Sequence, residues 1–124
     1  MKWKPVLLPC VFYRTLNGHE PVREWLKELP AEERRQIGID IMAVQYGWPL
    51  GLPLVDSLGQ GLWEVRSRLP SLIARTFFCV QKGVIVLLHG FIKKTRTTPT
   101  HEIELARRRM RDVKNQSSPR KQSG

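Results

Sequence analysis

A group of basic side chains in the second half of the chain has the residue types to carry out a reaction. Arg66, Arg75 and the adjacent Lys93 and Lys94 each fall in, or at the end of, a segment with the pattern of a β-strand. A guanidinium binds phosphate through two parallel hydrogen bonds, and a lysine ammonium acts as a point charge. Several cations converging on one phosphate would stabilise a pentavalent transition state. RNA supplies its own 2′-OH as nucleophile, so these residues suit RNA cleavage.

The charge distribution points to the same class of ligand. Residues 1–61 carry seven Lys/Arg and seven Asp/Glu, whereas residues 62–124 carry fourteen Lys/Arg and four Asp/Glu, so the second half holds the whole net charge of +10. Such a field attracts polyanions, nucleic acid first and an anionic membrane or acidic protein second. Residues expected to contact RNA outside the catalytic group are Arg68, Phe91, Arg96, Arg107, Arg108 and Arg109.

Each of these residues also has a plain structural interpretation. Arg66 and Arg68 could form a solvated strand face, with Glu64 pairing with either of them across or along the sheet. Arg107–Arg109 matches a common solubility pattern on terminal helices, and Phe91 could belong to the core. Composition and spacing alone therefore favour a basic nucleic-acid-binding domain over a nuclease.

Metal-dependent chemistry has no matching residues in this sequence. His19, His89 and His101 show no metal-ligand spacing among themselves or with the two cysteines, and no carboxylates cluster to hold two metal ions. We therefore expect neither a metal nor another cofactor. The two cysteines are far apart in the sequence, so we expect them to be small buried residues of a protein in a reducing cytoplasm and not a disulfide framework. No segment is suited to spanning a membrane. These features predict a cytoplasmic protein without a membrane partner.

The first half of the chain predicts a strand followed by two helices. The segment from Val6 to Tyr13 is apolar and β-prone but contains Pro9, so we expect an edge strand or an irregular lead-in. Apolar residues then recur at helical spacing over residues 21–46, and Pro30 divides this stretch into the two arms of a helical hairpin. Residues 48–61, rich in Gly, Pro and Leu, are expected to form a loop.

The second half predicts three antiparallel strands and a final helix. The first strand alternates between a mostly apolar face and a fully charged face. Thr98 and Pro99 suit the start of the final helix. Residues 115–124 lack periodicity and are expected to be a flexible basic tail on one domain of residues 1–114. The fold class is α+β: a small curved antiparallel β-sheet with an N-terminal helical hairpin and a C-terminal helix. The three strands are expected at residues 62–68, 73–80 and 84–92.

From Leu58 to Val113 the chain resembles phage-type toxins of the RelE/HigB superfamily. The resemblance is carried, in chain order, by LGQGLWEVRSRL, IARTFF and VIVLLHGFIKKTRTTPTHEIELARRRM. The Gly-Phe-x-Lys-Lys-Thr segment in the third stretch is the most specific. Upstream, FYRTLNGHEPVREWLKELP resembles the first strand and helix of the family, so the similarity covers nearly the whole chain apart from the tail.

This resemblance implies a RelE-like fold and a toxin of a type II toxin–antitoxin system. Such toxins cleave mRNA, usually on the ribosome, without a metal ion, and leave a 2′,3′-cyclic phosphate. The partner implied is a HigA-like antitoxin with a helix-turn-helix DNA-binding domain, encoded beside the toxin. The matched motifs carry over Arg66, Arg75, Lys93 and Lys94 as the phosphate-binding and catalytic group.

The sequence departs from the family pattern in one respect that concerns catalysis. Relatives often have a tyrosine in the arginine-containing strand or near the C-terminus, but no tyrosine follows Tyr46 here. The general acid and base therefore stay open among His89, His101, Glu64 and a lysine of lowered pKa. The alternative function is a non-catalytic basic RNA- or ribosome-binding module. DNA binding ranks third, because no helix-turn-helix pair is evident.

Overall fold

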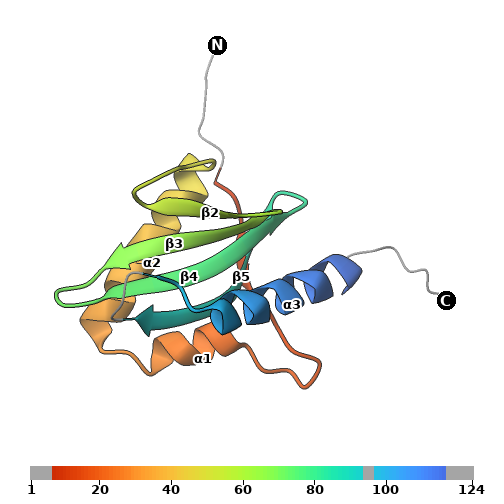
Figure 1. The fold of residues 1–124 in the computed structure, drawn as a ribbon, viewed down its shortest axis with the longest axis horizontal. Coiled ribbons are helices and arrows are strands. Elements are labelled where there is room, and N and C mark those ends of the chain that lie inside the picture. Colours follow the sequence, from red (N-terminus) through yellow and green to blue (C-terminus); the bar gives the residue numbers. More distant parts are fainter. Residues whose placement is uncertain (1–6, 94–96, 117–124) are drawn as a thin grey trace, which may run out of the picture.

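Two helices pack on one face of a five-stranded sheet, and a third helix packs on the other (Figure 1). The computed structural model describes residues 7–93 and 97–116, without the side chain of Lys93. The elements in chain order are β1 (Cys10–Phe12), α1 (Pro21–Lys27), α2 (Ala31–Gly47), β2 (Val55–Gly59), β3 (Leu62–Arg68), β4 (Ile73–Gln81), β5 (Val84–Lys93) and α3 (Thr100–Gln116). The α+β class and the three strands of the second half are as predicted.

The sheet is mixed, in the order β1-β5-β4-β3-β2, so the prediction of a purely antiparallel sheet is wrong. β1 lies parallel to β5, with Val11 beside Val86. The main-chain N–H of Tyr13 donates to the carbonyl of Leu87 at 2.9 Å. This pairing joins two segments that lie far apart in the sequence, and a local pattern of apolar residues does not encode such a partner. Short connections, by contrast, force β3, β4 and β5 to pair antiparallel.

β2 forms inside the segment that the sequence predicted to be a loop. Val55 is buried and lies opposite Val65 of β3, while Asp56 lies opposite Glu64. The strand is short and irregular, with a register shift between Ser57 and Gly59. It is therefore held by its pairing with β3, while the Gly and Pro residues around it hide the strand from a sequence pattern.

The predicted N-terminal helical hairpin matches only in part: the strand β1 comes first, where the sequence predicted an edge strand or lead-in, and the two helices contact different strands. α1 lies against β1 and β5, whereas α2 lies against β3. Pro21 occupies the first turn of α1, and Pro30 is the N-cap of α2. Arg34 donates to the carbonyl oxygen of Leu29 at 3.0 Å and thereby links α2 to the residues that end α1.

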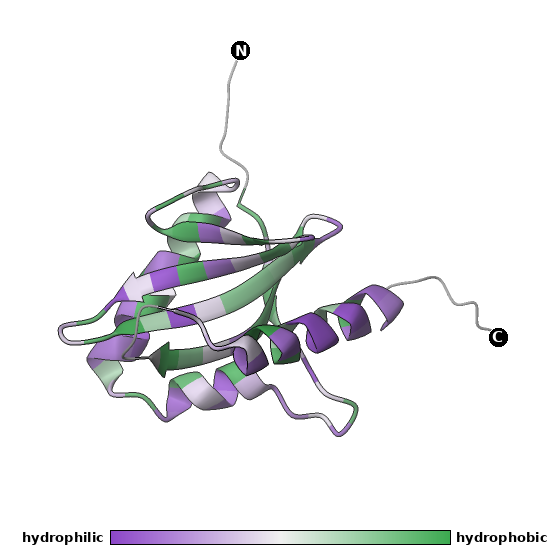
Figure 2. Cartoon of the chain, viewed as in Figure 1, coloured by the Kyte–Doolittle hydropathy of each residue, from purple (hydrophilic) through white to green (hydrophobic). Residues whose placement is uncertain are grey.

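Each face of the sheet carries its own hydrophobic core. Strand residues alternate between the two faces, so the adjacent Phe77 and Phe78 of β4 point in opposite directions. Phe78 packs beneath α1 and α2 with Val22 and Ile37. Phe77 packs beneath α3 with Met110. Figure 2 shows α3 with hydrophobic residues toward the sheet and hydrophilic residues outward.

Gly90 of β5 permits the close approach of α1. A Cβ atom at this position would lie 2.8 Å from Cη2 of the Trp25 ring and would overlap the ring more severely at two other atoms. The glycine in the His-Gly-Phe segment is therefore explained by packing.

α3 extends to Gln116, so it includes two residues that the sequence assigned to the tail. Residues 117–124 lie outside the described part of the chain. Within the described part, no helix is both long enough and apolar enough to cross a membrane.

Candidate functional site

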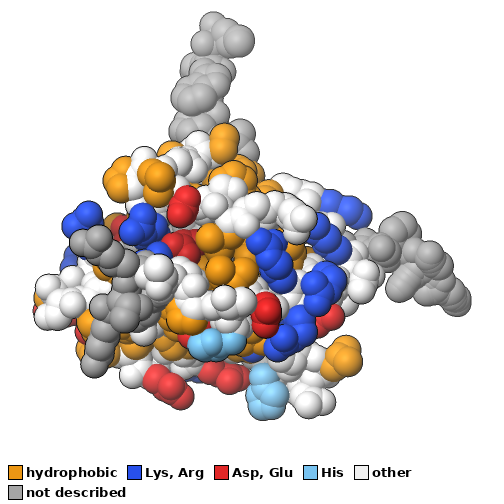
Figure 3. Space-filling view, viewed as in Figure 1, with side chains coloured by type: hydrophobic (Ala, Val, Ile, Leu, Met, Phe, Trp, Pro, Cys, Tyr) orange, Lys and Arg blue, Asp and Glu red, His pale blue; other side chains and the backbone are white. Residues whose placement is uncertain are grey.

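The two arginines predicted to act together lie directly opposite each other in the sheet. Arg66 of β3 is the register partner of Arg75 of β4, and Arg75 is in turn beside Phe91 of β5. Register partners in an antiparallel pair point to the same face, with Cβ atoms roughly 5 Å apart. The face they share is the one that α3 covers in part. Figure 3 shows this face, with Lys and Arg side chains over α3 and near the end of β3.

Glu64 joins the two arginines. Its Oε2 atom bonds Nη1 of Arg75 and lies 4.0 Å from Nε of Arg66. The side chains of Glu64 and Arg75 are only 2% and 4% exposed, whereas that of Arg66 is 33% exposed. The cluster of Glu64, Arg66 and Arg75, named here the Glu64 cluster, is thus a buried ion pair with a second guanidinium that reaches solvent.

The burial of Arg75 decides what each arginine can do. A buried ion pair forms only where mutual attraction and hydrogen bonds offset the loss of hydration. Arg75 is therefore bound to Glu64 and is not presented to a ligand in this conformation. Arg66 is the cation of the cluster that can contact a phosphate from solvent. The sequence predicted equal roles for the two, and their difference in exposure comes from tertiary packing.

Lys93 is the last residue of β5, where its backbone pairs with Ile73. Its side chain, Lys94 and Arg96 lie outside the described part of the structure. Their predicted contacts with RNA therefore stay predictions.

Phe91 is buried in the core beneath α3. Its ring lies 5.6 Å from that of Phe77 and is stacked at 5.7 Å on the imidazole of His89. This is the core position that the sequence allowed as one interpretation. Stacking on an RNA base would require Phe91 to leave these two rings.

A bulge in β5 creates a second polar cluster beneath α3. Phe77 pairs with His89 but the next residue, Phe78, pairs with Leu87, so Leu88 is an extra residue in the strand. Arg109 of α3 donates to the carbonyl oxygen of Leu88 at 2.8 Å. The α3 helix thereby satisfies a backbone group next to the bulge.

His89 beside this bulge is held between two residues of α3. Its Nε2 lies 2.5 Å from Oε1 of Glu102, and its Nδ1 lies 3.5 Å from Nη1 of Arg109. Burial lowers the pKa of His89 most strongly, while the Glu102 hydrogen bond and charge act to raise it. Both ring nitrogens thus face residues of α3, and this geometry ties the helix to the sheet.

The prediction that Arg107, Arg108 and Arg109 form an outer helix face is wrong for two of the three. Arg107 donates to the carbonyl oxygens of Leu58 at 2.6 Å and Gly59 at 3.2 Å, at the turn between β2 and β3. Arg109 contacts Leu88, and its guanidinium lies 5.6 Å from the centre of the Tyr13 ring. Only Arg108 is exposed. A helical period of 3.6 residues places successive arginines at different angles around α3, so Arg107 and Arg109 reach carbonyl oxygens of the sheet while Arg108 does not.

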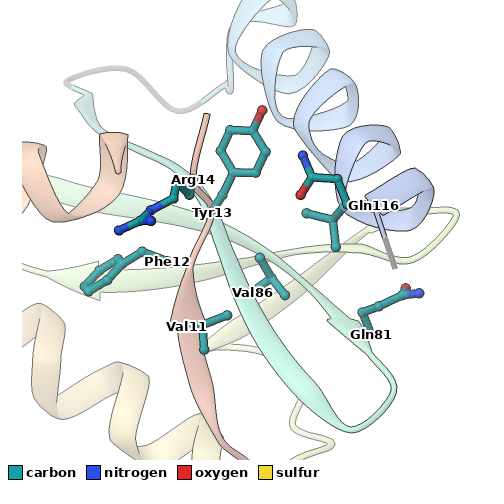
Figure 4. A pocket seen from close by; sticks show the side chains of 8 residues that line it. Val11, Phe12, Tyr13, Arg14, Gln81, Val86 and Gln116 are labelled. Carbon is teal, nitrogen blue, oxygen red and sulfur yellow. The ribbon is translucent and has the colours of Figure 1, made fainter. Parts of the chain in front are cut away.

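Tyr13, which follows the edge strand β1, links this strand to α3. Its hydroxyl donates to Oδ2 of Asp112 at 2.7 Å. Burial and the hydrogen bond and charge of Asp112 raise the pKa of Tyr13, so the phenol stays protonated at neutral pH. A hollow of about 370 Å³ lies beside it, lined by residues that include Val11, Arg14 and Gln116 (Figure 4). Among the described residues that line this hollow, Arg14 is the basic one. The hollow borders β1 and lies away from the Glu64 cluster.

A model of the phage-derived Gp49-like protein family (DUF891) matches residues 24–111. The chain belongs to this family. It is a family of the RelE/Gp49 toxin type, so the predicted relationship to RelE-type toxins is confirmed at that level. No curated protein matches the chain. The matched residues of this Gp49-like chain run from α1 into α3 and include the whole Glu64 cluster.

A toxin-type family implies an antitoxin as partner. Among residues 7–93 and 97–116, no three His, Cys, Asp or Glu side chains group in a way that could hold a metal ion. The Glu64 cluster of this Gp49-like chain consists of two guanidinium groups and one carboxylate, and its solvent-accessible guanidinium can bind an anion. Glu64 was named by the sequence as one candidate for proton transfer, but its role as the link between Arg66 and Arg75 required the sheet register.

Proposed function

We propose that this chain is the toxin of a type II toxin–antitoxin system and an endoribonuclease that cleaves mRNA on the ribosome without a metal ion. The observation that carries the proposal is the register pairing of Arg66 with Arg75 around Glu64, on the basic face of a chain from a RelE/Gp49-type family. The reaction would be attack of the 2′-OH on the adjacent phosphate. It would give a 2′,3′-cyclic phosphate and a free 5′-OH.

Arg66 would bind the non-bridging oxygens of the scissile phosphate, because it is the solvent-accessible guanidinium of the cluster. Arg75 would hold Glu64 in place and would not contact the phosphate itself. Glu64 lies beside Nε of Arg66, so the Nη atoms of Arg66 would be left for the ligand. Lys93 and Lys94 would neutralise the phosphate and the leaving oxygen from the end of β5. A cationic site of this kind favours the doubly charged transition state over the singly charged ground state.

Proton transfer has a different candidate list once the structure is considered. His89 has both ring nitrogens directed at Glu102 and Arg109, so we assign it to holding α3 in place. His101 is exposed and lies 3.6 Å from Glu102 on the first turn of α3. Glu64, which shares the sheet face of Arg66, and a lysine of lowered pKa remain the proton-transfer candidates.

The cognate partner would be a HigA-like helix-turn-helix antitoxin in the same cytoplasm. A second function is favoured by one observation, the burial of Arg75. If Arg75 serves the fold alone, the chain would be a non-catalytic basic module that binds RNA or the ribosome. Both functions predict binding that weakens with salt, because phosphate contacts release counterions.

Cleavage of translated mRNA tests the proposal directly. The chain is induced in bacteria with and without the neighbouring reading frame, and mRNA ends are mapped by primer extension. We expect growth arrest and new mRNA ends that the antitoxin prevents. In a purified translation system, intact ribosomes should support cleavage after metal-free washing of the toxin, and the upstream product should end in a cyclic phosphate.

Binding of ribosomes without new mRNA ends would favour the non-catalytic module. A 3′-hydroxyl product would exclude the 2′-OH mechanism. Arg66→Ala is the first variant to compare, because its side chain is partly exposed and its loss should spare the fold. We expect cleavage to fall roughly 10²-fold, the scale for one lost electrostatic stabiliser.

A further inference from the structure

A cavity of about 260 Å³ adjoins the Glu64 cluster at the edge of the sheet. Its walls are Arg66 and Arg68 of β3, Gln36 and Asp40 of α2, and Pro53 and Leu54 before β2. Arg66 belongs to both places, since its Nε lies 4.0 Å from Oε2 of Glu64 and the residue also lines the cavity. A ligand whose phosphate is bound by Arg66 would have its neighbouring group at this cavity.

The cavity lies where β3 extends beyond its pairing with β2. The N–H of Arg66 donates to the carbonyl oxygen of Leu54 at 2.8 Å, and the β2 pairing runs from Val55 onward in the other direction. β3 continues to Arg68 without β2 beside it. The two-residue period of strand hydrogen bonding directs the main chain of Arg68 toward this open edge. The open edge therefore offers backbone groups as well as two arginine side chains.

The helix side of the cavity presents hydrogen-bond acceptors. Nε2 of Gln36 donates to Oδ1 of Asp40 at 3.1 Å. This bond fixes the pair, both residues of which line the cavity, and Oε1 of Gln36 and Oδ2 of Asp40 are the further side-chain acceptors of the pair. Two adjacent acceptors match the Watson–Crick edge of guanine, whose N1–H and N2–H groups are adjacent donors. Uracil offers a single N–H donor on that edge.

A second cavity of about 430 Å³ continues along the same edge. It shares Gln36 and Arg68 with the first and is lined further by residues that include Glu32, Glu33, Arg35 and Pro70. The two adjoining cavities, from Arg66 to Pro70, are together named here the groove. Arg66 and Arg68 are two residues apart on the strand, which places their Cα atoms roughly 6.6 Å apart. This separation suits two successive phosphates of an extended single strand.

We propose that this groove binds single-stranded RNA next to the scissile phosphate, and that Gln36 and Asp40 select guanine as the base in the first cavity. Arg68 holds the adjoining phosphate, and Pro53 packs on the face of the base. Protein groups commonly recognise unpaired RNA bases on their Watson–Crick edges. The inference rests on the proposed endoribonuclease function, and it assigns the sequence preference that the Glu64 cluster alone does not supply.

Sequencing of all mRNA 5′ ends tests the preference. For the wild-type chain we expect guanine to be enriched at a fixed position beside the cut. Asp40→Asn removes the carboxylate without a large change in shape, and we expect the preference for guanine over uracil to fall about tenfold, the scale of one bidentate base contact. Glu104→Gln is the matched control, because Glu104 is an exposed residue of α3 and the substitution removes the same charge. The control should keep the wild-type distribution.

A second readout does not depend on cleavage. Guanosine and uridine monophosphates are titrated into the full wild-type chain, and backbone amide shifts are followed by NMR. We expect guanosine monophosphate to shift Gln36, Asp40 and Arg68 at lower concentration than uridine monophosphate does, and Asp40→Asn to remove the difference.

The outcomes separate the two proposals. Cleavage with the same site distribution in wild type and Asp40→Asn would overturn the guanine site and leave the endoribonuclease intact. Without any cleavage the endoribonuclease proposal fails, and the titration alone decides whether the groove binds a nucleotide. Equal shifts with both nucleotides, or shifts elsewhere only, would overturn the groove assignment.

Discussion

Replacing Glu64 by Gln should destabilise the protein strongly. The substitution keeps the size of the side chain but removes the carboxylate that bonds Arg75, and both side chains are at most 4% exposed. Breaking a buried ion pair from one side costs about 3–5 kcal/mol, because a charge stays buried without its partner. For a domain of this length, such a loss lowers the melting temperature by roughly 12–20 °C.

The double variant Glu64→Leu/Arg75→Met separates the ion pair from the packing. It removes both charges and retains apolar volume, so its free energy of unfolding should lie much closer to that of the wild type than that of Glu64→Gln. Urea denaturation of the wild type, Glu64→Leu, Arg75→Met and the double variant yields the coupling energy as a double-mutant cycle.

A coupling energy of several kcal/mol is expected from this cycle. If the free energy of unfolding of Glu64→Gln lies within about 1 kcal/mol of the wild-type value, the ion pair does not hold β3 and β4 together. In mRNA cleavage, the double variant should be inactive although folded, because Arg66 has lost the carboxylate that lies 4.0 Å from its Nε. Full activity in a folded double variant would remove Glu64 and Arg75 from the site.

Three further predictions follow from the packing around β5. Gly90→Ala should lower the free energy of unfolding by about 1–3 kcal/mol, because the new methyl group overlaps the Trp25 ring, and thermal melts measure this loss. The pKa of His89 is lower in the folded state than in the unfolded state, so the unfolded state binds the proton first as pH falls. The free energy of unfolding should therefore decrease as pH falls from 7.5 through 6.5 to 5.5. Urea titrations at each pH should show a smaller decrease for His89→Asn. Burial raises the pKa of Cys79 to about 11, so iodoacetamide at pH 8 should label this thiol only after unfolding, as mass spectrometry can detect.

The sequence predicted well whatever depends on neighbours along the chain. The alternation in residues 62–68 placed Glu64, Arg66 and Arg68 on one face, and the structure has them there. The hairpin between residues 80 and 84 brought β4 and β5 together as expected. These features follow from strand period and turn length, which are local properties.

Pairings between distant segments were decided only by the tertiary structure. The partner of β1 is β5, and β2 exists because β3 supplies its hydrogen bonds. Arg107 and Arg109 looked like solvent-facing residues but bind carbonyl oxygens of the sheet. A side chain's environment depends on which unsatisfied backbone group lies within its reach, and residue spacing does not record that.

The candidate site shows the same division. Residue type and the family resemblance predicted Arg66 and Arg75 as phosphate ligands, because guanidinium chemistry belongs to the residue. Their unequal exposure, 33% and 4%, arises because Glu64 and the overlying core bury one and leave the other at a sheet edge. The sequence determines the charge of a residue. The packing of distant segments sets the dielectric environment and the partners of that charge, and these determine what the charge can bind.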